Sequence, residues 1–348
     1  SFLLAIGMLY PFSAWAEGQN HIINLAGKWH FAQGDVPSYE DQVDLPGSML
    51  TNGKGDAVTV NTRWVSSLYD SSYYFNPYME KYRVPGKMKF PFFLTPSKHY
   101  VGNAWYKRSV FVPKDWKHRR VVLFLERPHI ETTVFVNGKE AGRDSSLSVP
   151  HEFDITPYVL WGKDNEITLK IYNGIEHVCV GQDSHSVTDQ TQGDWNGVVG
   201  RMELQSKPMD YIKDLQVYPD VDNNRIRVRM VMADKRRRHD VQFFLLKSNG
   251  GAAEKLKGMR FLGDTLSVLL PMGDKVELWD EFNPHVYTLS VLMDGERTNV
   301  NFGMRKFTAE GRQIYINGRK TWIRGTVGNC CFPLTGYPPT DTASWIRI

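Results

Sequence analysis

The chain has 348 residues, of which 41% are hydrophobic, 23% charged and 13% aromatic, and its formal net charge is +4. This composition is that of an ordinary globular protein, and it excludes a disordered chain and a small disulfide-stapled scaffold. Because 42 basic residues face 38 acidic ones over the whole length, the chain has no extended basic field, and we expect no nucleic-acid partner.

The first sixteen residues, SFLLAIGMLYPFSAWA, form an apolar stretch that carries no charge before Glu17. They resemble the hydrophobic part of a secretory signal with a small-residue cleavage site at Ala14 and Ala16. The run is too short to span a bilayer, and Pro11 interrupts it. We therefore expect a signal-peptide remnant over residues 1–16, a secreted or periplasmic protein and no stable membrane span. A buried first strand is the alternative.

Residues 17–207 are predicted to form one all-β domain. Short strand-like segments follow one another between turn residues, among them 104–113, 120–126, 132–142 and 165–172. Val134 and Val136 alternate with Phe135, and Asn137-Gly138 is a strong signal for a two-residue hairpin turn. The pattern predicts an antiparallel sandwich of the jelly-roll kind. Residues 58–98, rich in Tyr, Pro and Phe, are expected to form a loop packed on its surface.

A second pattern of strands covers residues 208–306. In RIRVRMVM, three arginines alternate with Ile226, Val228 and Met230, as expected for a strand with one wet face. Further strand-like segments are 214–219, 240–247, 264–271 and 286–293. The length and the strand spacing predict an immunoglobulin-like sandwich. The basic run KRRRH (235–239) is interpreted as a solvated turn between two strands rather than a site for an anion.

Residues 307–348 show a third pattern. A hairpin is predicted from Gln313 through Asn317-Gly318 to Ile323, followed by a loop rich in Cys, Pro and Gly and by TASWIRI, which reads as the start of a helix. A strand, a loop and an incipient helix fit the first unit of a (β/α)8 barrel, whose remaining units need about two hundred further residues. The fold expected for the chain is therefore all-β: a jelly roll, an immunoglobulin-like sandwich and the first strand of a truncated barrel.

Several motifs, in this order, resemble family 2 of the glycoside hydrolases, which includes β-galactosidases, β-glucuronidases and β-mannosidases. They are LAGKWHF (25–31), LPGSM (45–49), GNAWYKRSVFVP (102–113), HIETTVFVNGKEAG (129–142), HEFDITPYV (151–159), DWNGVVGRMEL (194–204), LWDEFNPHVYTL (278–289) and FGMRKFTAEGRQIYINGRKTWIRGT (302–326). In the seventh motif Glu281 stands where the family usually has proline. The resemblance spans residues 25 to about 341 and implies a sugar-binding domain, an immunoglobulin-like domain and the entry into a catalytic barrel.

The resemblance also implies a chemistry. Family 2 enzymes are retaining glycosidases, in which one carboxylic acid protonates the leaving oxygen and a second carboxylate, about 5 Å away, attacks the anomeric carbon. In the family the acid/base Glu follows an Asn in the barrel. The Asn-Glu pair present here, Asn165-Glu166, falls in a strand of the first domain. Both catalytic carboxylates are therefore expected beyond Ile348, and this chain alone is expected to be inactive although its full-length parent hydrolyses glycosides.

The residues left to contact a carbohydrate substrate lie in two loops. In the family, the loop that closes the sugar-binding domain places an Asp against sugar hydroxyls. Here this loop is residues 181–197, with Asp189 as first and Asp194 as second candidate, after Asp183 is set aside. Trp195 offers a flat face to the C–H edge of a sugar. The alternative is that these carboxylates cap turns of their own backbone.

The second loop, residues 324–336, follows the expected barrel strand and places Asn329 and Cys330 toward the substrate. β-Galactosidases usually have a His-rich sequence here, so Asn-Cys-Cys-Phe-Pro points away from a plain galactoside. A nucleophilic role for Cys330 is not expected, because the family mechanism needs no thiolate. Cys330-Cys331 has no flanking His at ligand spacing, and we expect neither a metal nor a cofactor. A disulfide from Cys179 to either cysteine is permitted but not required.

A second function from another class fits two β-sandwiches equally well: a carbohydrate-binding or adhesion protein without catalysis. Residues 307–348 separate the two hypotheses, because a binding protein has no need of a hairpin that leads into a barrel. The sugar, its linkage and the oligomeric state do not follow from the sequence.

Overall fold

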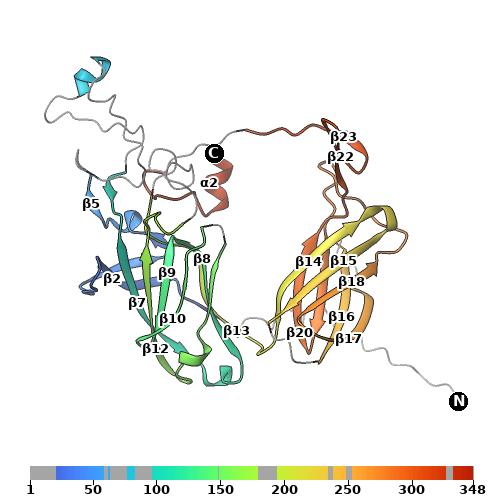
Figure 1. Cartoon of the computed structure of the whole chain (residues 1–348), viewed down its shortest axis with the longest axis horizontal. Coiled ribbons are helices and arrows are strands. Elements are labelled where there is room, and N and C mark those ends of the chain that lie inside the picture. The colour runs from blue at the N-terminus through green and yellow to red at the C-terminus, as the bar shows by residue number, and fades with distance from the viewer. Residues whose placement is uncertain are drawn as a thin grey trace. The chain divides into compact units, whose positions relative to one another are not determined.

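The computed structural model describes residues 21–58, 62, 77–82, 96–147, 149–178, 194–233, 238–247, 253–326 and 332–347. The chain divides into two compact units, one of Ser1–Ser206 with Gly328–Ile348 and one of Lys207–Val327. Each unit is built on a β-sandwich (Figure 1), so the all-β fold class is confirmed. None of the helices found in the described residues is long and apolar enough to cross a membrane.

The described strands of the first unit stack as a five-stranded and a six-stranded antiparallel sheet. The five-stranded sheet consists, in spatial order, of β1 (Ile22–Asn24), β13 (Gly197–Lys207), β8 (Arg120–His129) and β11 (His151–Asp154), with β4 (Gly47–Ser48) beside β13. The six-stranded sheet consists of β10 (Lys139–Asp144), β9 (Glu131–Val136), β12 (Lys163–Tyr172), β7 (Asn103–Val112), β2 (Gly27–Gln33) and β3 (Asp41–Leu45). A short ladder joins β5 (Asp56–Ala57) to β6 (Lys98–His99).

The core of this sandwich follows the alternation seen in the sequence. Val134 and Val136 are completely buried, whereas Phe135 between them lies on the outer face. Trp29 is one of the largest buried side chains, and its Nε1 donates to the Leu25 carbonyl at 3.0 Å, which satisfies its polar atom inside the core. Asn137 and Gly138 both have positive φ, as the predicted hairpin between β9 and β10 requires.

The second unit is a sandwich of a three-stranded and a four-stranded sheet. Its sheets consist of β14 (Ile212–Asp220), β15 (Arg225–Met232) and β18 (Thr265–Pro271), and of β17 (Glu254–Leu262), β16 (Arg238–Lys247), β19 (Tyr287–Met293) and β20 (Glu296–Phe302). Along β15, Ile226, Val228 and Met230 are buried, as expected for a strand with one wet face. Tyr287 opens β19, and its hydroxyl accepts a hydrogen bond from the Glu277 amide at 2.8 Å. This tyrosine corner is typical of immunoglobulin-like sandwiches.

The interpretation of KRRRH as a solvated turn is wrong at its end. Arg238 and His239 belong to β16, and the His239 side chain is completely buried. Its Nε2 lies 2.8 Å from Asp210 Oδ2, and its Nδ1 lies 2.7 Å from Asp294 Oδ2. The ring thus joins the segment that leads into β14 to the turn between β19 and β20, and these two carboxylates explain why a histidine is tolerated inside.

After the second sandwich, a small antiparallel sheet forms from β21 (Phe307–Glu310), β22 (Gln313–Ile316) and β23 (Arg319–Thr321). The predicted hairpin is present, but its second strand ends two residues early. Residues 322–326, which follow this hairpin, belong to no helix or strand, and the barrel start stays a prediction. The expected helix is α2 (Thr342–Arg347), and its Asp341 caps it by accepting from the Ser344 amide at 2.8 Å.

Candidate functional site

One end of the first sandwich gathers polar and aromatic side chains from several chain segments. Asp194 and Trp195 lie directly before β13, Asn173 directly after β12, and His129 at the end of β8. In Figure 1 this is the end of the sandwich on which α2 lies, beside β8 and β9. The sheet pairing explains why these side chains meet. β8 and β13 are neighbours in one sheet, and β12 lies in the other sheet between β9 and β7.

The Asp194 carboxylate is turned into the sandwich and is completely buried. Its Oδ2 accepts a hydrogen bond from Asn173 Nδ2 at 2.6 Å, and its Oδ1 lies 3.4 Å from His129 Nδ1. Asn173 is fixed in turn, since it donates to the Tyr100 carbonyl at 2.7 Å and accepts from the Gly102 amide at 2.9 Å. This geometry gives Asp194 the part of a positioning residue for the chain that carries Trp195. A contact of Asp194 with sugar hydroxyls stays a prediction.

Trp195 is half-buried between two other rings. The imidazole of His129 lies almost parallel to the indole, with centroids 4.7 Å apart and 19° between the planes. His129 Nδ1 also lies 2.8 Å from the Trp195 carbonyl oxygen. Tyr337 approaches the indole at 5.5 Å with its ring tilted by 57°. Trp195 is therefore held on both its backbone and its ring, and part of its face is already covered.

The contact with Tyr337 is one of the contacts by which residues 335–337 pack against this end. Ser48 Oγ donates to the Thr335 carbonyl at 2.6 Å. Gly336 has φ +82°, and a Cβ added to it would lie 2.6 Å from the Cβ of Trp195. Since that distance is shorter than real Cβ contacts, only glycine lets the backbone come so close. The segment that follows the second sandwich in sequence thus returns to the first.

Asn196, next to Trp195 in the chain, connects the segment before β13 to two strands, β7 and β12. Its Oδ1 accepts from the Tyr106 hydroxyl at 2.8 Å, and its Nδ2 donates to the Ile171 carbonyl at 3.0 Å. Burial raises the pKa of Tyr106 far above its usual value, so its hydroxyl stays a donor. Sequence reasoning missed Asn196, Asn173, His129 and Tyr337, because their roles depend on strands that meet only in the fold. In the sequence, the Asn between Trp195 and Gly197 was the one signal that could have indicated the role of Asn196.

The other expected site residues, Asp189, Asn329 and Cys330, lie outside the described residues, as do Asp183 and all three cysteines. Within the described part of the chain, no group of three or more His, Cys, Asp or Glu side chains is arranged to hold a metal ion.

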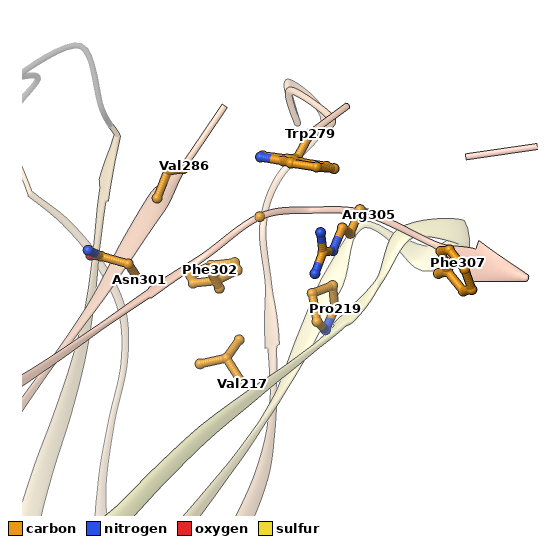
Figure 2. A pocket seen from close by; sticks show the side chains of 9 residues that line it. Val217, Pro219, Trp279, Val286, Asn301, Phe302, Arg305 and Phe307 are labelled. Atoms are coloured by element: carbon orange, nitrogen blue, oxygen red, sulfur yellow. The ribbon is translucent and has the colours of Figure 1, made fainter. Parts of the chain in front are cut away.

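A shallow hollow of about 470 Å³ lies in the second unit (Figure 2). Trp279 forms one wall, with the Arg305 guanidinium 4.7 Å from its ring centre, and Pro219, Phe302 and Phe307 contribute apolar surface. Trp279 is anchored from its backbone, because Asn317 Nδ2 donates to its carbonyl at 3.0 Å. None of the residues expected to contact substrate lines this hollow.

Comparison with known proteins places the first unit. Residues 22–208 match the sugar binding domain of glycosyl hydrolases family 2. A β-glucuronidase of Paenibacillus borealis is 23% identical over 248 residues, which cover 66% of this chain and 40% of that protein. A β-galactosidase of Priestia megaterium is 26% identical over 328 residues, which cover 87% of this chain and 30% of that protein.

Solved structures agree in fold. The β-glucuronidase of Ruminococcus gnavus in complex with D-glucuronic acid superposes with a TM-score of 0.61 at 17% identity, over 87% of this chain and 49% of that one. The β-glucuronidase of Dictyoglomus thermophilum gives a TM-score of 0.55 at 18% identity over the same share of this chain and 47% of that one. The chain thus spans less than half the length of these relatives, and it belongs to family 2 of the glycosyl hydrolases, whose sugar binding domain its residues 22–208 form.

Proposed function

We propose that the chain is the N-terminal part of a secreted retaining glycoside hydrolase that cleaves O-glycosyl bonds, β-galactosidase-like, in carbohydrate catabolism. Its sugar-binding jelly roll and immunoglobulin-like sandwich precede a catalytic barrel, and residues 307–348 are the entry into that barrel. Family membership and the named β-glucuronidase and β-galactosidase relatives support this activity. The apolar residues 1–16 support export to the periplasm or the outside.

The observation that carries the proposal is the packing of residues 335–337 at Trp195. The sequence pointed to two separate loops, 181–197 and 324–336, as contacts for the sugar. Trp195 in the first loop and Tyr337, the residue directly after the second loop, meet in a ring contact of 5.5 Å. Trp195 and Tyr337 belong to the same unit, as expected if both loops contribute to one sugar site. A binding protein without catalysis has no need of this return of the chain to its first domain.

In the proposed enzyme the roles divide. The two carboxylates that act on the glycosidic bond belong to the barrel and not to these 348 residues. This chain supplies a fixed wall, because Asp194 and His129 hold Trp195, and the resemblance to the family assigns further sugar contacts to Asp189, Asn329 and Cys330. A rim of fixed side chains lowers the entropy cost of holding a sugar in the geometry that the chemistry needs.

The test uses two proteins and one substrate class. The 348-residue chain and the longer protein encoded with it are assayed with nitrophenyl β-D-galactoside and nitrophenyl β-D-glucuronide. We expect hydrolysis of at least one substrate by the longer protein and none by the 348-residue chain. Turnover by the short chain, or none by the longer one on either substrate, would refute the proposal.

A further inference from the structure

A carboxylate near the same end of the first sandwich holds an arginine and a histidine side chain. Glu131 opens β9 and is largely buried, with 11% of its side chain exposed. Its Oε1 lies 3.1 Å from Arg143 Nη2, and its Oε2 lies 3.2 Å from His177 Nδ1. Glu131 is paired with Tyr172 of β12 in the strand ladder, and this pairing fixes the backbone under the carboxylate next to the turn that carries His177.

A second contact pair fixes the turn that carries His177. The Tyr172 ring lies 5.8 Å from the His177 ring, and the Tyr172 hydroxyl donates to Glu176 Oε2 at 3.0 Å. Burial, with Glu176 next, raises the pKa of Tyr172 to about 12, so this hydroxyl keeps its proton at neutral pH. Glycine at position 174 leaves space for the Tyr172 hydroxyl, because a Cβ there would lie 2.4 Å from the hydroxyl oxygen.

The hydrogen bond between His177 Nδ1 and Glu131 determines whether Nε2, the other ring nitrogen, is a donor or an acceptor. A carboxylate only accepts, so the proton sits on Nδ1, and in the neutral ring Nε2 becomes an acceptor. Within the described residues no hydrogen bond to Nε2 is found, and 59% of the His177 side chain is exposed. The Arg143 side chain is 58% exposed and keeps further N–H groups for a ligand.

An exposed acceptor and an exposed donor, both fixed on one buried carboxylate, match the hydrogen-bonding pattern of neighbouring sugar hydroxyls. Each hydroxyl can donate to His177 Nε2 or accept from Arg143. The place fits as well: Ile130 alone separates Glu131 from His129, whose ring stacks on Trp195. A purely structural ion cluster would not need its histidine open to solvent.

We propose that His177 and Arg143, oriented by Glu131, form an additional carbohydrate subsite that takes a neutral, hydroxyl-rich sugar unit of an oligosaccharide. This subsite extends the proposed function, since it would bind a unit beyond the one held at Trp195. Glu131 is its positioning residue and does not touch the sugar.

The first test is binding to the 348-residue chain, with lactose as the neutral disaccharide, followed by NMR of ¹⁵N-labelled histidine rings. We expect lactose to shift the His177 ring signals, and His177→Gln and Arg143→Gln to weaken binding at least fivefold. His30→Gln, at an exposed histidine of β2, is the matched control and leaves the affinity unchanged. Unmoved His177 signals, or wild-type affinity in His177→Gln, would overturn the subsite and leave a structural cluster.

Glu131→Gln separates orientation from fold. Its amide can present an N–H instead of an oxygen to Nδ1, so we expect the ¹⁵N signals of His177 to report a changed tautomer and the affinity for lactose to fall. A lower melting temperature with unchanged tautomer and affinity would contradict the positioning role.

The longer protein tells this subsite apart from the proposed function. There His177→Gln should lower the ratio of kcat/KM for lactose to kcat/KM for nitrophenyl β-D-galactoside at least fivefold. An unchanged ratio in an active enzyme rejects the subsite alone. If the wild type hydrolyses neither substrate, the glycosidase proposal is rejected. The subsite is then still tested independently by lactose binding to the 348-residue chain.

Discussion

The imidazole of His129 covers one part of the Trp195 indole at a centroid distance of 4.7 Å, while its Nδ1 lies 2.8 Å from the carbonyl oxygen of the same tryptophan. One side chain thus fixes both the backbone and the ring of Trp195. The buried Asp194 lies 3.4 Å from the same nitrogen. Ring, carbonyl and carboxylate together make Trp195 a fixed wall rather than a mobile surface residue.

Replacing His129 should therefore loosen this wall. We expect His129→Ala to lower the free energy of unfolding by about 2 kcal/mol, through the lost ring contact and the hydrogen-bonding capacity lost beside a buried carboxylate. Urea unfolding followed by circular dichroism measures the change. A loss below about 0.5 kcal/mol, as for an ordinary surface substitution, would show that the ring contact does not contribute to the free energy of unfolding.

Gly336→Ala should detach residues 335–337 from the first sandwich. The added Cβ would lie 2.6 Å from the Trp195 Cβ, and φ at this position is +82°. Limited chymotrypsin digestion should then cleave after Leu334 and Trp345 faster than in the wild type. Gly325→Ala is the matched control, since a Cβ there meets nothing within 4 Å. Equal cleavage rates in the two variants would contradict the docking.

His151 predicts a dependence of stability on pH. Burial lowers its pKa from 6.5, although the Ser146 carbonyl and Asp144 act in the opposite direction. The unfolded chain takes up a proton near pH 6.5 while the folded chain takes it up only at lower pH, so folding loses stability as the pH falls below 6.5. The free energy of unfolding should drop between pH 8 and pH 5, and His151→Gln should flatten this drop. An equal drop in both proteins would exclude His151 as its source.

His239 should be essential to the second sandwich. In His239→Leu two carboxylates, Asp210 and Asp294, lose the ring that lies between them at 2.8 and 2.7 Å. Asp210 is buried, and removing a partner of a buried carboxylate costs about 2 kcal/mol. Asp240→Asn, in an exposed pair with Arg260, is the control and should cost less than about 1 kcal/mol. Similar losses in the two variants would show that the buried pairs contribute no more than a surface pair.

Much of the fold could be predicted because its signals are local. The dipeptides Asn137-Gly138 and Asn317-Gly318 indicate hairpin turns by their residue types. All four residues have the positive φ that such turns need. The alternation in β15 placed its buried residues correctly. By contrast β17 was missed, because this edge strand is mostly exposed and its sequence EKLKGMRFL lacks an alternating apolar face.

The candidate site was harder to predict, because its contacts join residues far apart in sequence. Asp194 could be selected as an acidic residue in a promising loop, but nothing local shows that Asn173 turns its carboxylate inward. Tyr337 meets Trp195 only because the chain returns to the first unit after the second sandwich. His239 was misinterpreted for the same reason: its two carboxylate partners come from distant segments.

The central claim is that the end of the first sandwich that carries Trp195 forms part of the sugar site of a glycosidase. The most direct measurement is kcat/KM of the proposed full-length enzyme on its better nitrophenyl glycoside, for the wild type, Trp195→Ala and Phe282→Ala. Phe282, 73% exposed in the second unit and outside residues 307–348, is the control. We predict a fall of at least tenfold for Trp195→Ala, equivalent to about 1.4 kcal/mol of transition-state stabilisation, and little change for Phe282→Ala. A folded Trp195→Ala enzyme with wild-type kcat/KM would contradict the claim.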